Sequence, residues 1–209
     1  MILHNYYWYF KDALSHKFCD DVINYAKTFY EPKIAVTGGM KDTNLDNKKL
    51  RKLKKVRDAT VIWLDSNWIY NTIVPFLLKA NEEAGWNYQV DTPEQIQFTE
   101  YGHNQHYGWH VDAFKKPYDN EKDKKMFGKV RKLSLVCSLS DPNNYEGGEL
   151  QFNFNDRSTK TKYNIRTCTE VLSKGSVVVF PSFVWHRVTP VTEGTRHSLV
   201  NWCVGNPYK

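Results

Sequence analysis

Two histidines and an aspartate stand at spacings that suit a metal centre. His110 and Asp112 lie two positions apart, and His186 comes much later in the chain. If the segment around His110 is an extended strand, alternation places His110 and Asp112 on one face and Val111 on the other. Two imidazoles and one carboxylate on one face of an octahedron leave three positions open, an arrangement suited to non-haem Fe(II). His110, Asp112 and His186 are therefore the candidate metal ligands and catalytic residues.

An arginine ten residues after His186 adds a second kind of chemistry. Arg196 and Ser198 share a face by the two-residue period of a strand. Residues 189–195 have the composition of a turn, which would place Arg196 on an antiparallel strand beside the one that carries His186. An inward-facing arginine is costly unless a carboxylate pairs with it. That carboxylate belongs either to an acidic residue of the protein or to a ligand held bidentately, with the Ser198 hydroxyl as a further donor.

The elements that must position these residues change character near Pro93. Before it, apolar residues at helical spacing predict helices from Ser15 to about Tyr30 and from Asn67 to about Ala84. After it we expect about eight short strands, near residues 94–102, 107–112, 131–140, 148–154, 164–172, 176–180, 183–191 and 196–204. This pattern predicts a mainly β (α+β) chain with flanking helices, arranged as a β-sandwich or jelly roll.

The length of 209 residues suits one domain with a sizeable core. We expect residues 1–92 to form supporting helices and a loop, and residues 93–206 to form the jelly-roll core. Residues 32–57 are predicted to be a long mobile segment and residues 113–130 an exposed flap, because both are rich in polar and turn-forming residues. Either could cover a substrate or be a solvated linker.

Three aromatic residues flank the candidate metal ligands in the sequence. They are Trp109, Phe183 and Trp185. Such side chains could shape a substrate groove, but ordinary packing beside a β core is the favoured interpretation.

The charge of the chain is concentrated in one place. The net charge is +6, and seven of the 29 basic residues fall within residues 48–57, which contain no acid. Without those seven, the chain carries 22 basic and 23 acidic residues. The run could bind nucleic acid, but a solvated loop or helix face is the preferred interpretation.

The composition excludes several classes of protein. At 41% apolar and 25% charged residues the chain is not intrinsically disordered, and no apolar run is long enough to cross a bilayer. Residues 1–8 lack the features of a secretory signal. The four cysteines show no metal-binding or disulfide spacing. We therefore predict a cytoplasmic protein with no membrane partner.

Together these motifs resemble the Fe(II)/2-oxoglutarate-dependent dioxygenases, in which H-x-D, a distal histidine and an arginine ten residues later recur. Four local strings are similar to the prolyl-4-hydroxylase-like branch, which includes the PKHD-type hydroxylases. They are Arg131–Leu135, Tyr145–Phe152, His186–Val191 and Gly194–Trp202. The match covers about Gln95 to Gly205.

The resemblance implies a double-stranded β-helix, the jelly roll of cupin-like proteins. It implies that His110, Asp112 and His186 bind iron, and that Arg196 binds the C5 carboxylate of 2-oxoglutarate. Tyr101, like Tyr107, matches aromatic positions that line the cofactor pocket, although a core position would look the same. Related oxygen-sensing enzymes add a tyrosine hydroxyl where this chain has Ser138.

The cofactors implied are Fe(II), 2-oxoglutarate as co-substrate and O2, with ascorbate (vitamin C) as a candidate reductant. The leading hypothesis is hydroxylation of a C–H bond in a prolyl residue of a peptide or protein, with succinate and CO2 as products. The same chemistry on a free amino acid, a small metabolite or a nucleobase is an alternative, as is a non-catalytic jelly-roll binding protein. Nucleic acid ranks below peptide, because AlkB-like repair enzymes carry a second arginine where this chain has Trp202.

Overall fold

The computed structural model describes residues 6–36, 46–154 and 165–208. Within them the chain is mostly antiparallel β-strand with three α-helices, so the predicted mainly β class with flanking helices is confirmed. Residues 1–5, the middle of the predicted mobile segment (37–45) and the first residue of the strand predicted at 164–172 lie outside the described residues.

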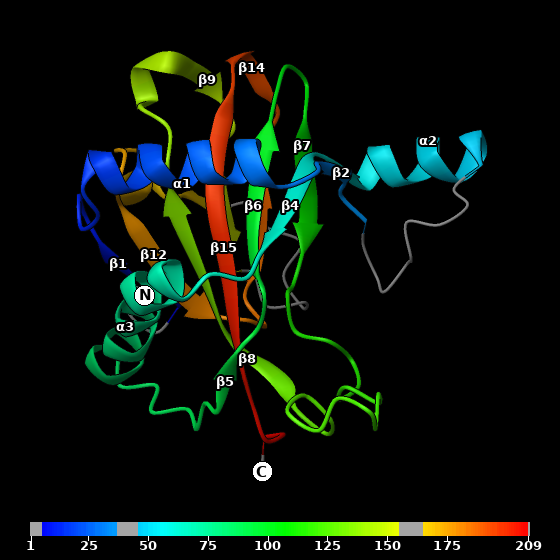
Figure 1. Cartoon of the computed structure of the whole chain (residues 1–209), viewed down its shortest axis with the longest axis vertical. Helices are drawn as coiled ribbons and strands as arrows, with labels where there is room; N and C mark the ends of the chain where they lie inside the picture. The colour runs from blue at the N-terminus through cyan, green and yellow to red at the C-terminus, as the bar shows by residue number, and fades with distance from the viewer. Residues whose placement is uncertain (1–5, 37–45, 155–164, 209) are drawn as a thin grey trace.

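Two facing sheets form the body of the protein (Figure 1). The larger sheet has the order β1 (Trp8–Phe10), β12 (Val177–Pro181), β8 (Val130–Ser138), β15 (Arg196–Gly205), β6 (Ile96–Tyr101), β4 (Thr60–Leu64) and β2 (Lys33–Ile34), with β5 (Thr92–Pro93) paired to β15. The smaller sheet has the order β11 (Ile165–Thr167), β10 (Leu150–Asn153), β13 (Trp185–Val188), β7 (His106–His110) and β3 (Arg57–Asp58). A separate pair joins β9 (Tyr145–Gly147) to β14 (Val191–Gly194).

Two helices cover the outer face of the larger sheet. Helix α1 (His16–Phe29) lies across this face in Figure 1, and α3 (Asn67–Glu83) packs beside it. The predicted cap of α1 is present, because Ser15 Oγ accepts the backbone N–H of Phe18 at 3.1 Å. None of the helices in the described part of the chain is long and apolar enough to cross a membrane.

Alternation along the central strands separates a core from an inner face. On β8, Leu133, Leu135 and Cys137 belong to the apolar cluster under the helices. The intervening Ser134 and Val136 face inward, toward the smaller sheet. The same period on β15 and β6 leaves an inner face of mixed polar and aromatic residues between the two sheets.

The N-terminal part contains more β structure than predicted. Residues 1–92 contribute the strands β1 to β4 in addition to α1 and α3. The basic run, predicted to belong to a mobile segment, forms a third helix, α2 (Asn47–Val56). Its start is capped by Asp46, whose Oδ1 accepts the backbone N–H of Lys49 at 2.7 Å.

The route from His186 to Arg196 also differs from the prediction. Residues predicted to be a turn contain strand β14, which pairs with β9. As a result, β13 with His186 lies in the smaller sheet and β15 with Arg196 lies in the larger one. The two residues therefore approach each other across the interior and not from neighbouring strands. The strand predicted at 164–172 is also shorter, because β11 gives way to a 3-10 turn at Thr169–Val171.

Candidate active site

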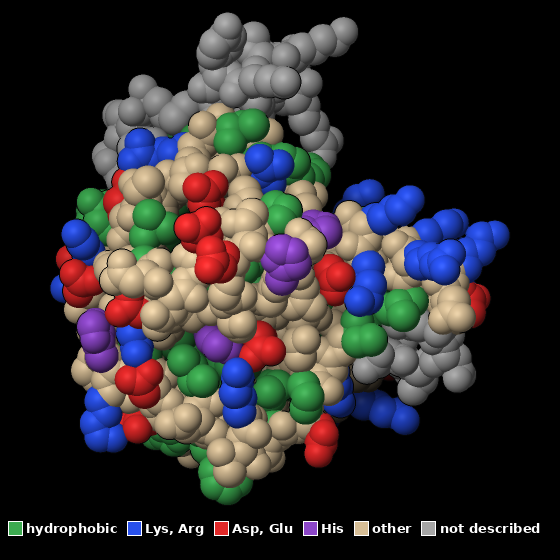
Figure 2. Space-filling model, turned by 90° about the horizontal axis from the view of Figure 1, so that it is seen from above, with side chains coloured by type: hydrophobic (Ala, Val, Ile, Leu, Met, Phe, Trp, Pro, Cys, Tyr) green, Lys and Arg blue, Asp and Glu red, His purple; other side chains and the backbone are tan. Residues whose placement is uncertain are grey.

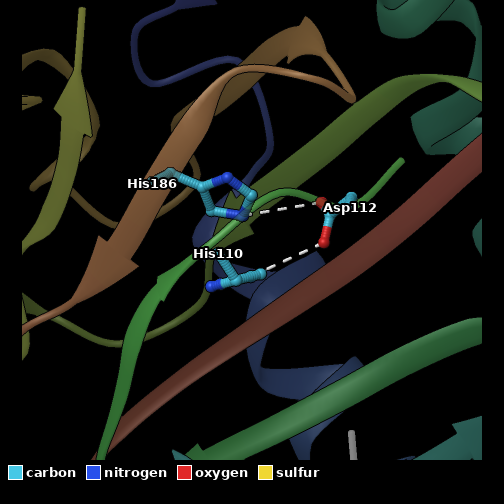
Figure 3. A group of neighbouring side chains, drawn as sticks. All are labelled: His110, Asp112 and His186. Carbon is cyan, nitrogen blue, oxygen red and sulfur yellow. Dashed lines mark ion pairs between the residues drawn. The ribbon is translucent and has the colours of Figure 1, made fainter. Parts of the chain in front are cut away.

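Three side chains from the smaller sheet and the turn after it converge in the interior (Figure 3). His110 is the last residue of β7, and the register of β7 and β13 places His186 opposite it. Asp112 lies just beyond the end of β7, where its backbone N–H is bound by the Ser182 carbonyl at 2.9 Å. His110 Nε2 lies 3.6 Å from Asp112 Oδ1, and His186 Nε2 lies 3.5 Å from Asp112 Oδ2. One ligand atom from each residue falls within 4.8 Å of the other two, which is the spacing of a metal site.

Backbone contacts fix the tautomers of both histidines. Nδ1 of His110 lies 2.8 Å from the Gly108 carbonyl, and Nδ1 of His186 lies 2.9 Å from the Val184 carbonyl. Because a carbonyl oxygen only accepts, each Nδ1 must carry the proton. Each Nε2 therefore presents its lone pair to the centre of the site, as a metal ligand requires.

Burial and neighbouring side chains shift the pKa values of His186 and Asp112. Burial lowers the pKa of His186 to about 4, so this imidazole is neutral near neutral pH. Burial alone would raise the pKa of Asp112, but attraction from His186, His110 and Arg131 outweighs it and holds that pKa well below its usual range. Two histidine Nε2 atoms and one carboxylate are a donor set that fits Fe(II).

A cavity of about 500 Å³ opens beside the three residues and reaches the facing sheet. Its wall combines basic, aromatic and aliphatic side chains. Besides the three, it is lined by Val36, Val56, Arg57, Trp63, Gln97, Tyr101, Tyr107, Val111, Phe114, Arg131, Val136, Leu150, Val188, Arg196, Ser198, Val200 and Trp202. This volume is in the usual range for small-molecule sites.

Arg196 enters this cavity from the larger sheet. Its side chain is buried, and no acidic residue in the described part of the chain forms an ion pair with it. Gly148 makes room for it: a Cβ there would lie 2.9 Å from Arg196 Cδ, at a φ of +60° that favours glycine. Of the two partners considered for Arg196 from the sequence, an internal acid or a ligand carboxylate, the geometry favours the ligand.

Of the other residues singled out from the sequence, three line the cavity and one does not. Ser198 and Tyr101 are buried and line the cavity, and Tyr101 pairs with Arg196 in the register of β6 and β15. Tyr107 also lines it and stacks on His110 with ring centroids 3.5 Å apart. Ser138 is not among the lining residues, because its hydroxyl donates to the Val171 carbonyl at 2.7 Å.

Several residues that line the cavity were not predicted from the sequence. Arg131 makes a bidentate ion pair with Glu94, with Nε and Nη2 at 2.6 and 2.7 Å from the two carboxylate oxygens. The guanidinium carbon lies 3.9 Å from the ring centroid of Trp202. Arg57 lies over the Tyr107 ring at 4.5 Å. Only the position of Trp202 six residues after Arg196 gave a signal in the sequence.

Two of the three aromatic residues flanking the ligands are more exposed than predicted, whereas Trp109 is partly buried. Phe183 and Trp185 were expected to pack, but they are 49% and 38% exposed. Strand β13 is at this point a surface strand with one outward face, so Trp185 alternates outward while His186 points inward.

Comparison with known proteins agrees with this geometry. A sequence model of the 2OG-Fe(II) oxygenase superfamily matches residues 96–204, just over half of the chain and the part that carries every ligand discussed above. The chain belongs to this superfamily. Its members use Fe(II), 2-oxoglutarate and O2, as predicted from the sequence.

Similar proteins of known sequence include PKHD-type hydroxylases. One from Synechococcus sp. (strain CC9605) is 40% identical over 96 residues, which are 46% of this chain and 35% of that protein. One from Idiomarina loihiensis is 26% identical over 166 residues, 79% of this chain and 62% of that protein. The chain thus matches between about a third and two thirds of the length of these relatives. The resemblance to the PKHD-type branch is confirmed.

Solved structures with the same fold include two prolyl hydroxylases. A prolyl-4-hydroxylase of Pseudomonas putida has a TM-score of 0.62 at 17% identity, covering 95% of this chain and 92% of that one. A viral collagen prolyl hydroxylase from Paramecium Bursaria Chlorella virus-1, in complex with 2-oxoglutarate, has a TM-score of 0.59 at 18% identity and covers 96% of both chains. At these identities the likeness establishes the fold, and the predicted jelly roll is confirmed, with sheets that are antiparallel and not closed into a barrel.

Proposed function

We propose that this protein is an Fe(II)- and 2-oxoglutarate-dependent oxygenase that hydroxylates a prolyl residue of a peptide or protein. The proposal rests on the position of Arg196, which is buried, has no ion-pair partner among the described residues and lies in the same cavity as the cluster of His110, Asp112 and His186. An oxygenase of this kind needs its metal ligands and a cation that binds the co-substrate carboxylate to line the same pocket.

The roles follow from the geometry of each group. His110, Asp112 and His186 would hold the iron, with the two Nε2 atoms already turned toward the centre. Fe(II) held there, with O2 as the oxidant and 2-oxoglutarate as the reductant, would supply the chemistry of C–H hydroxylation, in which one oxygen atom of O2 goes to the substrate and the other to succinate as CO2 is released.

The residues of the larger sheet would orient the co-substrate. Arg196 would bind its distal carboxylate bidentately and Ser198 would donate a further hydrogen bond. Tyr101, beside Arg196 in the sheet, would close the same end of the cavity, and burial raises the pKa of its phenol so that it stays a neutral donor. Together they would leave the opposite end of the cavity for the substrate.

The substrate end has the character expected for an uncharged ring. Trp202 and Phe114 contribute apolar surface there, and Arg131 lies over both rings. Because Glu94 neutralises Arg131, this wall carries no net charge. An apolar wall with neutralised charge suits a pyrrolidine ring better than a free carboxylate or phosphate.

The oxygenase activity can be tested separately from the identity of the substrate. Purified protein with Fe(II) and 2-oxoglutarate should form succinate slowly in the absence of substrate, and His110→Ala and Asp112→Ala should abolish this turnover. His106→Ala, on the same strand but outside the cluster, is the matched control and should retain it. Turnover that survives in the first two variants would refute the ligand assignment, whereas absence of turnover in the unmodified protein would favour a non-catalytic protein.

The choice of substrate then depends on product analysis. A mass gain of one oxygen on a proline-containing peptide would support the proposal. The same gain only on a free amino acid, a small metabolite or an oligonucleotide would keep the oxygenase and overturn the prolyl assignment.

A further inference from the structure

Helix α2 is a strongly basic arm at the side of the molecule. Six of its ten residues are lysine or arginine, and Leu53 is its buried residue. It projects from the body at the right of Figure 1, and Figure 2 shows basic side chains gathered over the same arm. The proposed chemistry does not use this surface.

Most of the charge on α2 is uncompensated. Lys49 faces Asp46 at 3.8 Å and Lys54 faces Asp58 at 3.5 Å. In the described part of the chain no acid pairs with the remaining four cations, which are Lys48, Arg51, Lys52 and Lys55. Like charges three and four residues apart on a helix repel one another. A polyanion lying along α2 would relieve this repulsion.

The end of α2 forms part of the cavity rim. Val56, its last residue, and Arg57, which follows, both line the cavity. The carbonyl oxygen of Val56 lies 3.2 Å from where a side chain at Gly108 would begin, so α2 is seated against the strand that ends at His110. The basic arm therefore adjoins the rim of the cavity.

We propose that α2 docks an acidic stretch of a polypeptide substrate, close in sequence to the residue that enters the cavity. The proposal rests on the proposed function, because it takes the substrate to be a polypeptide. A ten-residue helix is about 15 Å long, which four or five residues of an extended chain would span. The acidic residues should therefore lie within about ten positions of the target residue on one side.

The surface of α2 favours a polypeptide over other polyanions. Its ten residues include no aromatic side chain, on which the bases of a single-stranded nucleic acid would stack. Its apolar residues are Leu50, Leu53 and Val56, of which Leu53 is buried, so it lacks the apolar face of a membrane-surface helix. Acidic side chains on an extended peptide need only exposed cations.

The experiment measures equilibrium binding of labelled peptides by fluorescence anisotropy, with the full chain, Fe(II) and 2-oxoglutarate in the absence of oxygen. Each peptide has one central proline, followed or preceded by a run of glutamate or, as the comparison, glutamine. We expect a glutamate peptide to bind roughly tenfold more tightly than its glutamine counterpart at low salt, and the difference to shrink as salt rises. The variant Lys48→Gln/Arg51→Gln/Lys52→Gln/Lys55→Gln should lose this preference.

A matched variant controls for net charge. Lys11→Gln/Lys122→Gln/Lys124→Gln/Lys125→Gln removes the same charge from exposed lysines outside α2 and should keep the preference. Equal binding of the glutamate and glutamine peptides, or equal loss in both variants, would overturn the proposal. The proposal would also be overturned if an oligothymidine or phosphatidylserine vesicles bound more tightly than the glutamate peptide and lost this binding in the α2 variant.

Binding needs no turnover. A chain that binds the glutamate peptide through α2 yet forms no succinate would therefore contradict only the proposed function.

Discussion

Ser134 donates a hydrogen bond of 2.7 Å to Oδ2 of Asp112, and its oxygen also contacts Ser182 Oγ at 2.9 Å. Ser134 belongs to β8 in the larger sheet, whereas Asp112 follows β7 in the smaller one. The contact therefore fixes one carboxylate oxygen from across the interior and leaves the other free to bind a metal. A serine that touches no metal would thus position the ligand that does.

Replacement of Ser134 by alanine should weaken metal binding without removing a ligand. Loss of a hydrogen bond to a ligating carboxylate lowers metal affinity by about 10–100-fold in comparable sites. We expect Ser134→Ala to raise the Kd for Fe(II), or for Mn(II) as a stable substitute, by about tenfold in an anaerobic titration. Ser138→Ala, four residues along the same strand, removes a buried hydroxyl that bonds to the Val171 carbonyl and should leave the Kd unchanged. Equal affinity in Ser134→Ala and the unmodified protein would contradict the positioning role.

Arg196→Gln should impair use of 2-oxoglutarate more than it impairs folding. A charged bidentate contact is worth about 1.5–3 kcal/mol, so the apparent KM for 2-oxoglutarate should rise by at least about tenfold. The measurement is succinate formation as a function of 2-oxoglutarate concentration. Arg187→Gln is the control, because Arg187 bonds to Gln151 and lies over Trp109 without lining the cavity. An unchanged KM in Arg196→Gln would assign the co-substrate to another cation of the cavity.

The candidate site was predictable where its residues lie close to one another in the sequence. The spacing of His110 and Asp112, and of His186 and Arg196, is local and survives any uncertainty about which strands pair. Pairing itself was not predictable, because residues 189–195 have turn composition yet form β14 against β9. Whether Arg196 reaches the site from a neighbouring strand or from the opposite sheet depends on that pairing.

Long-range electrostatics and local capping explain the other differences. Glu94 and Arg131 resemble surface charges in the sequence, and only the fold brings them together in the interior. From its polar composition the basic run was interpreted as a solvated loop or a helix face, and the structure shows a helix, with a cap from Asp46 and a narrow apolar stripe from Leu50 and Leu53. A short stripe of this kind gives little signal against a background of charge.

Breaking the pair of Glu94 and Arg131 should destabilise the protein strongly. Their side chains are 11% and 12% exposed, and Tyr118 donates a further hydrogen bond to Glu94 at 2.8 Å. Glu94→Gln leaves a buried guanidinium without its counter-ion, which costs about 3–5 kcal/mol of unfolding free energy in such pairs. Urea unfolding should show this loss, and the double variant Glu94→Leu/Arg131→Met should recover part of it. A double variant less stable than Glu94→Gln would show that the pair itself, and not the uncompensated charge, provides the stability.

Glu100 should make stability depend on pH in the acid range. It accepts from His197 Nε2 at 2.9 Å and from Lys27 Nζ at 2.7 Å. The bond from His197 lowers the pKa of Glu100 most, burial opposes it and Lys27 adds to the lowering, so that the pKa falls from 4.5 to about 2. Because the folded-state pKa is below the unfolded one, the stabilisation is complete above about pH 4.5 and is lost as the pH falls toward 2.

Glu100→Gln should therefore be less stable than the unmodified protein at about pH 5.5, and this difference should be small at about pH 3. The side chain of Glu100 is 31% exposed, so solvent screening limits the expected loss to roughly 1 kcal/mol near pH 5.5. Urea unfolding at about pH 5.5 and about pH 3 should show the difference from the unmodified protein shrinking at the lower pH. Glu146→Gln, an exposed glutamate without an ion pair among the described residues, should show no such change. A loss in Glu100→Gln that is the same at both pH values would mean that shape and hydrogen bonding, not ionisation, account for the contribution of Glu100.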